Sequence, residues 1–137
     1  MIVNEHGKVM DVDGAQDVEN RNIIVWNKHG GLNQQWDVIY VDEYPAEPIK
    51  GELNEQFGLY VLRDFYINTE LGLHRHLTVT DGSKLAIKTK NGNKQQIWYF
   101  DQTSLTIKNK KDNKSFNINS NGASKTTNVY TTNSNWW

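Results

Sequence analysis

The chain has 137 residues, of which 36% are hydrophobic, and it carries a formal net charge of −1 and no cysteine. This length is enough for one domain with a buried core, and the absence of cysteine excludes a disulfide framework, a thiolate metal site and a cysteine nucleophile. No apolar run approaches the length of a membrane-spanning helix, so we expect a soluble protein. Its compartment stays open, with secretion favoured.

The small net charge hides an uneven distribution along the chain. Residues 1–64 carry 12 acidic and 5 basic side chains, a net charge of −7, whereas residues 65–137 carry 4 acidic and 10 basic ones, a net charge of +6. This split favours head-to-tail self-association, so a homo-oligomer is a hypothesis. The basic tract 108–111 has no aromatic-basic interleaving or known motif beside it, so we interpret it as turn lysines and expect no nucleic-acid partner.

Three groups of short segments recur along the chain, and they are typical of strands because apolar and polar residues alternate in them. The first strand of each group is expected at 9–12, 76–79 and 115–118, the second at 23–26, 85–88 and 127–130, and a tryptophan segment follows at 33–38, 95–100 and 134–137. Turn residues such as Asp13-Gly14 and Asn91-Gly92 separate the strands. About four strands in each of three repeats predict a closed all-β body with pseudo-threefold symmetry, because one such unit cannot bury its apolar face alone.

The spacing of the tryptophans indicates an insertion in this single domain. Trp36 and Trp98 are 62 residues apart, whereas Trp98 and Trp137 are 39 apart. We therefore expect repeat one at 1–40, an insertion at 41–64, repeat two at 65–101 and repeat three at 102–137. The insertion is interpreted as a packed excursion over one barrel end, with a short helical turn at 52–57, and the alternative is a partner-binding segment.

The third repeat stops at Trp137, before the position of its last strand. We expect the chain to be a fragment of a longer protein. The alternatives are imperfect closure of the fold and a strand supplied by a neighbouring chain.

The order and spacing of the segments 7–12, 24–26 and 33–36 resemble the ricin-B-type lectin family, the Gln-x-Trp β-trefoils. The resemblance covers nearly the whole chain outside the insertion and weakens from repeat one to repeat three. It implies a β-trefoil, a six-stranded barrel capped by three hairpins, with a shallow sugar site on the outer surface of each repeat.

The resemblance implies that the sugar site of repeat one consists of Asp11, Trp26, Asn33 and Gln34. A carboxylate accepts two charge-assisted hydrogen bonds from neighbouring hydroxyls, and an indole offers a flat apolar face to a sugar ring. Gln34 is expected to orient Asp11 or the backbone rather than to contact the ligand. Ile24 departs from the family pattern, which often has a glutamine there. The expected core tryptophans are Trp36, Trp98 and Trp137.

The other two repeats depart further from the pattern. In repeat two Thr78 replaces the aspartate and Lys88 the aromatic residue, and their interval is 10 residues against 15 in repeat one, so the loop expected to line the pocket is shorter. We expect this site to be lost as a sugar site. In repeat three Asn117 and Tyr130 could form a weak site in place of Asp11 and Trp26.

Other constellations are interpreted as structural. Asp11, Asp13, Asp17 and Glu19 do not fit the calcium-loop pattern, and His74 and His76 are two ligands only, so they are interpreted as surface histidines. With no catalytic motif in the sequence, we expect no cofactor, no metal and no enzyme activity, although the chain could be the accessory domain of a larger enzyme.

The predicted function is that of a carbohydrate-binding module whose partners are glycans. The alternative is an assembly β-trefoil that has lost lectin activity and mediates protein–protein contacts. In that alternative Asp11 caps a turn and Trp26 is a half-buried surface aromatic.

Overall fold

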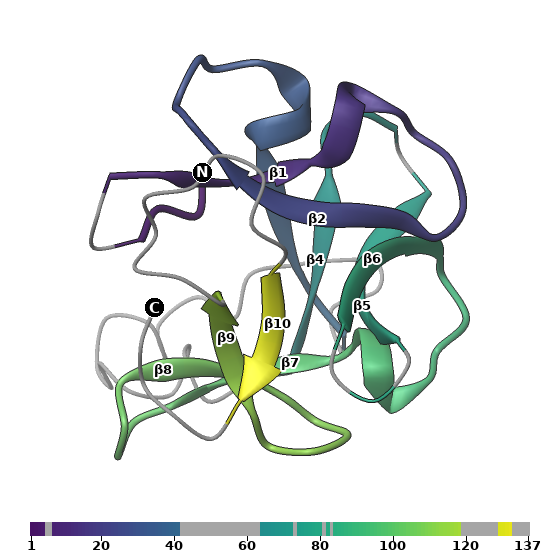
Figure 1. The fold of residues 1–137 in the computed structure, drawn as a ribbon. Helices are drawn as coiled ribbons and strands as arrows, with labels where there is room; N and C mark the ends of the chain where they lie inside the picture. Colours follow the sequence, from purple (N-terminus) through teal and green to yellow (C-terminus); the bar gives the residue numbers. More distant parts are fainter. Residues whose placement is uncertain are drawn as a thin grey trace, which may run out of the picture.

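The computed structural model describes residues 1–4, 7–41, 64–72, 74–80, 82, 84–118 and 129–132, with only the backbone described at 117–118 and 129–132. Ten strands form this part of the molecule (Figure 1): β1 (Val9–Val12), β2 (Arg21–Trp26), β3 (Trp36–Tyr40), β4 (Phe65–Thr69), β5 (Arg75–Thr80), β6 (Lys84–Thr89), β7 (Trp98–Asp101), β8 (Thr106–Asn109), β9 (Ser115–Ile118) and β10 (Val129–Thr132). Short 3-10 turns join some of them: η1 (Asp13–Ala15), η2 (Leu32–Gln34) and η4 (Lys94–Gln96). The expectation of an all-β chain is confirmed, and within these ranges no helix is both long and apolar enough to cross a membrane.

The strands pair antiparallel and close on themselves. Three hairpins recur along the chain, and we call β1–β2 the first, β5–β6 the second and β9–β10 the third hairpin. The pairings run from β4 through β5, β6, β10, β9, β8 and β7 back to β4. Figure 1 shows β1 and β2 across one end of the molecule, β7 and β8 across the other, and β4 running between them. This circuit gives the closed body that one four-stranded unit could not form alone.

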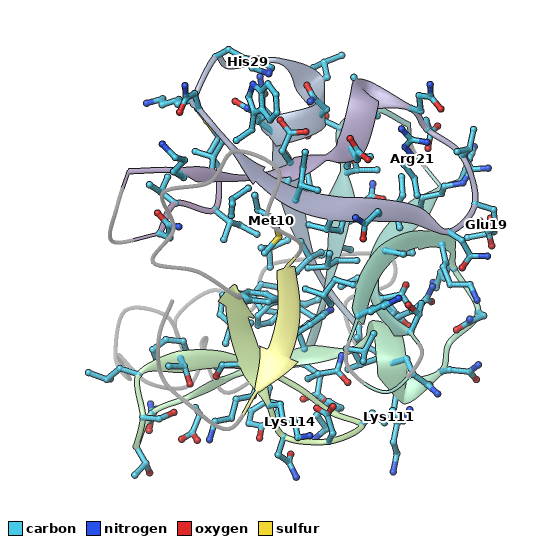
Figure 2. The ribbon with its side chains drawn as sticks, in the orientation of Figure 1. Met10, Glu19, Arg21, His29, Lys111 and Lys114 are labelled. Atoms are coloured by element: carbon cyan, nitrogen blue, oxygen red, sulfur yellow. The ribbon has the colours of Figure 1, made fainter. Side chains whose placement is uncertain are left out.

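The alternation of side chains along each hairpin divides it into a core face and an outer face. In the first hairpin the side chains of Met10, Val12, Ile23 and Val25 lie in the core, and Figure 2 shows Met10 directed into the interior. The second hairpin contributes Leu77, Val79, Leu85 and Ile87 in the same way, and the third contributes Phe116. The intervening residues therefore face outward, and they include the predicted site residues.

The two tryptophans at 36 and 98 are buried to different degrees. Trp98 has no exposed surface, its ring centroid lies 4.9 Å from that of Phe116, and its Nε1 donates to the Leu77 carbonyl oxygen at 3.1 Å. Trp36 is only partly buried against the core, and its Nε1 donates to the Met10 carbonyl oxygen at 3.3 Å. Each indole thus forms a hydrogen bond with the first strand of the hairpin that precedes it, β1 for Trp36 and β5 for Trp98. Trp137 lies outside the described residues.

The predicted insertion begins and ends at one point of the sheet. β3 and β4 pair from Trp36 opposite Thr69 to Tyr40 opposite Phe65, and beyond this ladder the Val41 N–H donates to the Asp64 carbonyl oxygen at 3.0 Å. The helical turn expected at 52–57 lies outside the described residues. β4 starts where repeat two was expected to start, yet it pairs with β3 of repeat one, so the repeat boundaries stay a prediction.

We predict that Trp98→Ala destabilises the protein by about 3–5 kcal/mol, because it removes a fully buried ring and leaves a cavity. Trp36→Ala should destabilise it less, since that ring is already partly in water. Urea unfolding of both variants beside the wild type measures the two losses. Equal losses would contradict the difference in burial.

Candidate functional site

The outer face of the first hairpin brings two of the predicted site residues together. Asp11 lies opposite Ile24, and Trp26 lies opposite Val9. In an antiparallel pair this places Asp11 and Trp26 on the same face at diagonal positions, about 7–8 Å apart. Asp11 is buried at 3% exposure, and Trp26 is partly buried. Ile24, the departure from the family pattern, is buried between them on that face.

Two amide groups hold the Asp11 carboxylate. The Asn33 Nδ2 donates to Oδ1 and the Gln34 Nε2 donates to Oδ2, both at 2.9 Å. Both amides come from the end of η2, which lies 22 and 23 residues further along the chain. An ionised carboxylate has about four acceptor positions, so the bonds from Asn33 and Gln34 do not use the full acceptor capacity of Asp11.

Gln34 acts as the internal support of this site. Its side chain has no exposed surface. The Oε1 accepts from the N–H groups of His29 at 2.9 Å and Gly30 at 3.2 Å, and the Nε2 donates to the Asn27 carbonyl oxygen at 2.9 Å as well as to Asp11. Two donors and two acceptor positions are the full capacity of a primary amide. Gln34 therefore has no donor or acceptor left for a sugar, which agrees with the expectation that it orients Asp11 or the backbone rather than contacting the ligand.

The loop between β2 and η2 requires glycine at two places. Gly30 has φ of +77°, in the left-handed region that favours glycine. A Cβ on Gly31 would lie 2.7 Å from both Asn33 Oδ1 and His29 Cε1. Any larger residue at position 31 would therefore displace the side chains that surround Asp11.

His29 is a site residue that the sequence reasoning missed. Its Nε2 lies 3.7 Å from Asp11 Oδ2, and its side chain is 47% exposed. Figure 2 shows His29 at the edge of the molecule, on the loop after β2. The sequence analysis did not single out His29, and the available signal was its position between Trp26 and Asn33.

The electrostatic environment of Asp11 opposes its ionisation. Burial raises the pKa of the Asp11 carboxyl, while the hydrogen bonds from Gln34 and Asn33 and the nearby His29 act in the opposite direction. The net result is a raised pKa, which identifies a carboxylate that is poorly solvated. A ligand hydroxyl that donates to it would replace part of the missing solvation.

The second hairpin repeats the same support with different outer residues. Gln96 has no exposed surface, its Oε1 accepts from the Asn91 N–H at 2.8 Å, and its Nε2 donates to the Thr89 carbonyl oxygen at 2.9 Å and to Thr78 Oγ1 at 3.2 Å. Thr78 thus takes the place of Asp11. Lys88, which lies two residues beyond the partner of Thr78, takes the place of Trp26. This equivalence agrees with the one inferred from the sequence.

The longer loop of the first hairpin contacts the second hairpin, and its expected role in lining the pocket stays a prediction. Arg75 Nη1 lies 2.9 Å from Asp17 Oδ1, and Arg75 Nε lies 3.2 Å from Glu19 Oε1. Glu19 Oε1 also accepts from the Thr89 N–H at 2.8 Å. The loop is therefore held against the second hairpin, and Figure 2 shows Glu19 on that side.

The carboxylates considered for calcium are engaged separately. Asp13 Oδ2 lies 3.7 Å from Arg21 Nη2, and Asp17 and Glu19 contact Arg75. Across the described ranges, no three histidine, aspartate or glutamate side chains converge as metal ligands would.

The expectation of two surface histidines is wrong for His76. His76 is 5% exposed, and its ring centroid lies 4.9 Å from that of Tyr66. Burial, with a contribution from the charge of Lys90, lowers the pKa of His76 to about 4. His74 is exposed, as expected. His76 is buried because β5 pairs with β4, where His76 lies opposite Asn68 and its ring packs against that of Tyr66. The alternation pattern of β5 alone did not predict this contact.

The register of the third hairpin changes the equivalences in the predicted weak site. Tyr130 lies opposite Asn117, as Ile24 lies opposite Asp11, and Thr132 takes the place of Trp26. The sequence alignment was therefore shifted by two residues in β10. Asn117 and Tyr130 still lie opposite each other in the strand register, and a weak site there stays a prediction.

No family model matches the sequence, and no curated protein matches it. Solved structures do resemble it. A designed three-fold symmetric protein, ThreeFoil, superposes with a TM-score of 0.70 at 19% identity, covering 98% of this chain and 90% of that one. The fold is a β-trefoil. This confirms the fold that the resemblance implied.

Two natural structures contain the same β-trefoil as part of longer chains. A mosquitocidal holotoxin has a TM-score of 0.70 at 14% identity, over 98% of this chain and 16% of its own. A non-toxic homologue of type II RIPs from Momordica charantia (bitter gourd), solved in complex with α-methyl-D-galactoside, has a TM-score of 0.61 at 20% identity, over 96% of this chain and 41% of its own.

Gln34→Glu is expected to destabilise the β-trefoil by about 3–5 kcal/mol at pH 7, because it places a second buried carboxylate against Asp11. Part of the loss should be recovered at acidic pH, where the introduced carboxyl group is protonated and can donate to Asp11. The matched control is Gln96→Glu, which faces the hydroxyl of Thr78. Urea unfolding at pH 4 and pH 7 compares the two variants, and an equal pH dependence would argue against the Asp11–Gln34 contact.

The raised pKa of Asp11 predicts a pH-dependent difference in stability between the wild type and Asp11→Asn. The folded state binds this proton more tightly than the unfolded state, so the stability that Asp11 contributes falls as pH rises from the ordinary aspartate value, about 3.9, through the raised pKa. The free energy of unfolding of the wild type minus that of the variant should therefore decrease over this window. Denaturant titrations between pH 3 and 7 measure it, and a difference that increases with pH would overturn the sign.

Proposed function

We propose that this β-trefoil is a carbohydrate-binding module rather than an enzyme, with its principal site at Asp11, Asn33 and Trp26. The observation that carries the proposal is the buried amide support. Asn33 and Gln34 hold both Asp11 oxygens while leaving acceptor capacity on each, beside an aromatic residue on the same hairpin face.

The roles of the three residues follow from their chemistry. Asp11 accepts from two neighbouring hydroxyls of the sugar, and its poor solvation makes those bonds favourable. Asn33 contributes an amide that both donates and accepts. Trp26 packs its rigid face against the apolar side of the ring. His29 lies at the edge of this arrangement, where its half-exposed ring is available to a second hydroxyl or to a linked sugar.

The comparison with the bitter gourd protein supports this proposal at the level of the fold. That protein was solved with α-methyl-D-galactoside, so galactosides are the first ligands to test. One shallow site gives a modest affinity, and tandem domains or oligomers would raise it through avidity.

The proposal is tested by a glycan array that compares the wild type with Trp26→Ala and Asp11→Asn. We expect sugar binding to fall at least about tenfold in each variant, since each removes an interaction worth about 1.4 kcal/mol or more. Asp11→Asn keeps the size of the side chain but replaces one of the two acceptors of Asn33 and Gln34 with a donor, so urea unfolding of this variant is measured beside its binding to separate a loss of affinity from a loss of stability. Val38→Ala, at an exposed position of β3, is the matched control and should bind as the wild type does.

A folded wild type that binds no glycan would reject the lectin assignment. The assembly alternative would then be examined by measuring the oligomeric state at low and high salt, because an electrostatic assembly must weaken as salt screens the charges.

A further inference from the structure

A pocket lies on the outer face of the second hairpin, at the positions equivalent to those of Asp11 and Trp26 in the first hairpin. It has a volume of about 800 Å³, within the range of small-ligand sites. Its lining is mostly polar. It includes three lysines, the hydroxyl of Thr78 and several side-chain amides: Lys84, Lys88, Lys111, Thr78, Asn91 and Gln95. We call it the lysine pocket.

The charge of the lysine pocket is of one sign. Lys84, Lys88 and Lys111 line it, and no carboxylate does so among the described residues. In the part of the chain that the structure describes, none of these three ammonium groups forms an ion pair, whereas Lys108 lies 2.6 Å from Asp101 and Lys110 lies 3.6 Å from Asp64. Three cations around one pocket, without an ion-pair partner among the described residues, attract an anion.

The pocket uses the scaffold of the Asp11 site with the opposite charge. Gln96 supports Thr78 as Gln34 supports Asp11. The two outward positions differ, because Thr78 brings no negative charge where Asp11 does, and Lys88 brings a cation where Trp26 offers an apolar face. The two hairpins therefore carry residues of different charge on the same kind of glutamine support.

The first hairpin supplies the opposite wall. The Asn20 N–H donates to the Ile87 carbonyl oxygen at 2.9 Å, and Asn22 lies opposite Ala86 in the β2–β6 pairing. The ion pairs of Arg75 with Asp17 and Glu19 hold the preceding loop in place. The first-hairpin wall is thus held against the second hairpin by strand pairing, a backbone hydrogen bond and two ion pairs. A wall that is already ordered reduces the conformational entropy lost when a ligand binds.

We propose that the lysine pocket binds a sulfated saccharide. The ammonium groups of the three lysines supply the positive charge that the sulfate group of such a ligand requires. The amides of Asn91, Asn93 and Gln95 are both donors and acceptors, as sugar hydroxyls are. The described lining contains no aromatic residue, so it offers no ring on which a nucleobase could stack.

This site is independent of the Asp11 site, and the experiment keeps the two apart. The wild type is titrated with galactose 6-sulfate, galactose and glucuronic acid at low salt, and the backbone amide shifts are followed by NMR. We expect the sulfated sugar to shift the amides of Thr78, Asn91 and Gln95, with an affinity at least about tenfold above that of the other two sugars at this pocket. The affinity should fall as salt rises.

The variants Lys88→Gln and Lys111→Gln remove one cation each and should weaken binding of the sulfated sugar about tenfold. Lys114→Gln is the matched control, because Lys114 lies on the same turn as Lys111 but outside the pocket lining (Figure 2). It should bind as the wild type does. All three lysines are at least partly exposed, so their substitution is not expected to disturb folding.

Several results would overturn the proposal. Shifts confined to the Asp11 site would assign sulfate binding to that site instead. An equal loss in Lys114→Gln would indicate attraction by overall charge rather than by a built pocket. A preference for glucuronic acid, or tighter binding of a single-stranded oligonucleotide at the same amides, would replace the sulfated sugar with another class of ligand.

Discussion

The side-chain amide of Gln34, which has no exposed surface, makes four hydrogen bonds that join three parts of the first hairpin and its following loop. Gln96 does the same for the second hairpin with Thr78 in place of Asp11. A buried amide left without partners costs about 1–3 kcal/mol for each missing bond, so the loop must take the conformation that satisfies all of them. The position of each outer site residue depends on this constraint.

The neighbouring tryptophan completes the arrangement two residues later. Trp36 and Trp98 donate to the carbonyl groups of Met10 and Leu77, each one residue before the outer site position. The glutamine therefore holds the side chain of the site residue and the tryptophan holds its backbone. This support requires only a side-chain oxygen that accepts from the glutamine. The same scaffold therefore presents a carboxylate and an indole on the first hairpin, and a hydroxyl and an ammonium group on the second.

Some of the opposite charges of the two halves of the chain form ion pairs within the molecule. Arg75, from the basic half, is paired with Asp17 and Glu19 from the acidic half, and Lys110 lies 3.6 Å from Asp64. These contacts are partly exposed, so their value lies in orienting a loop more than in stability. Self-association driven by the remaining charge stays a prediction. The loop held by Arg75 also forms one wall of the lysine pocket, which links the outer surfaces of two hairpins.

The sequence alone determined the all-β character and the first two hairpins, because alternation and the Gln-x-Trp spacing are local signals. The sugar-binding roles of the residues around Asp11 stay a prediction. Only the tertiary structure decided what depends on long-range packing. The complete burial of Gln34, the burial of His76 under Tyr66 and the approach of His29 to Asp11 are such cases. The two-residue shift in β10 is another, since Asn117 can be matched to its partner only through the strand pairing. The lysine pocket likewise combines residues of the first and second hairpins with Lys111 from the turn after β8. These residues are far apart in the sequence, so their proximity could not be predicted from it.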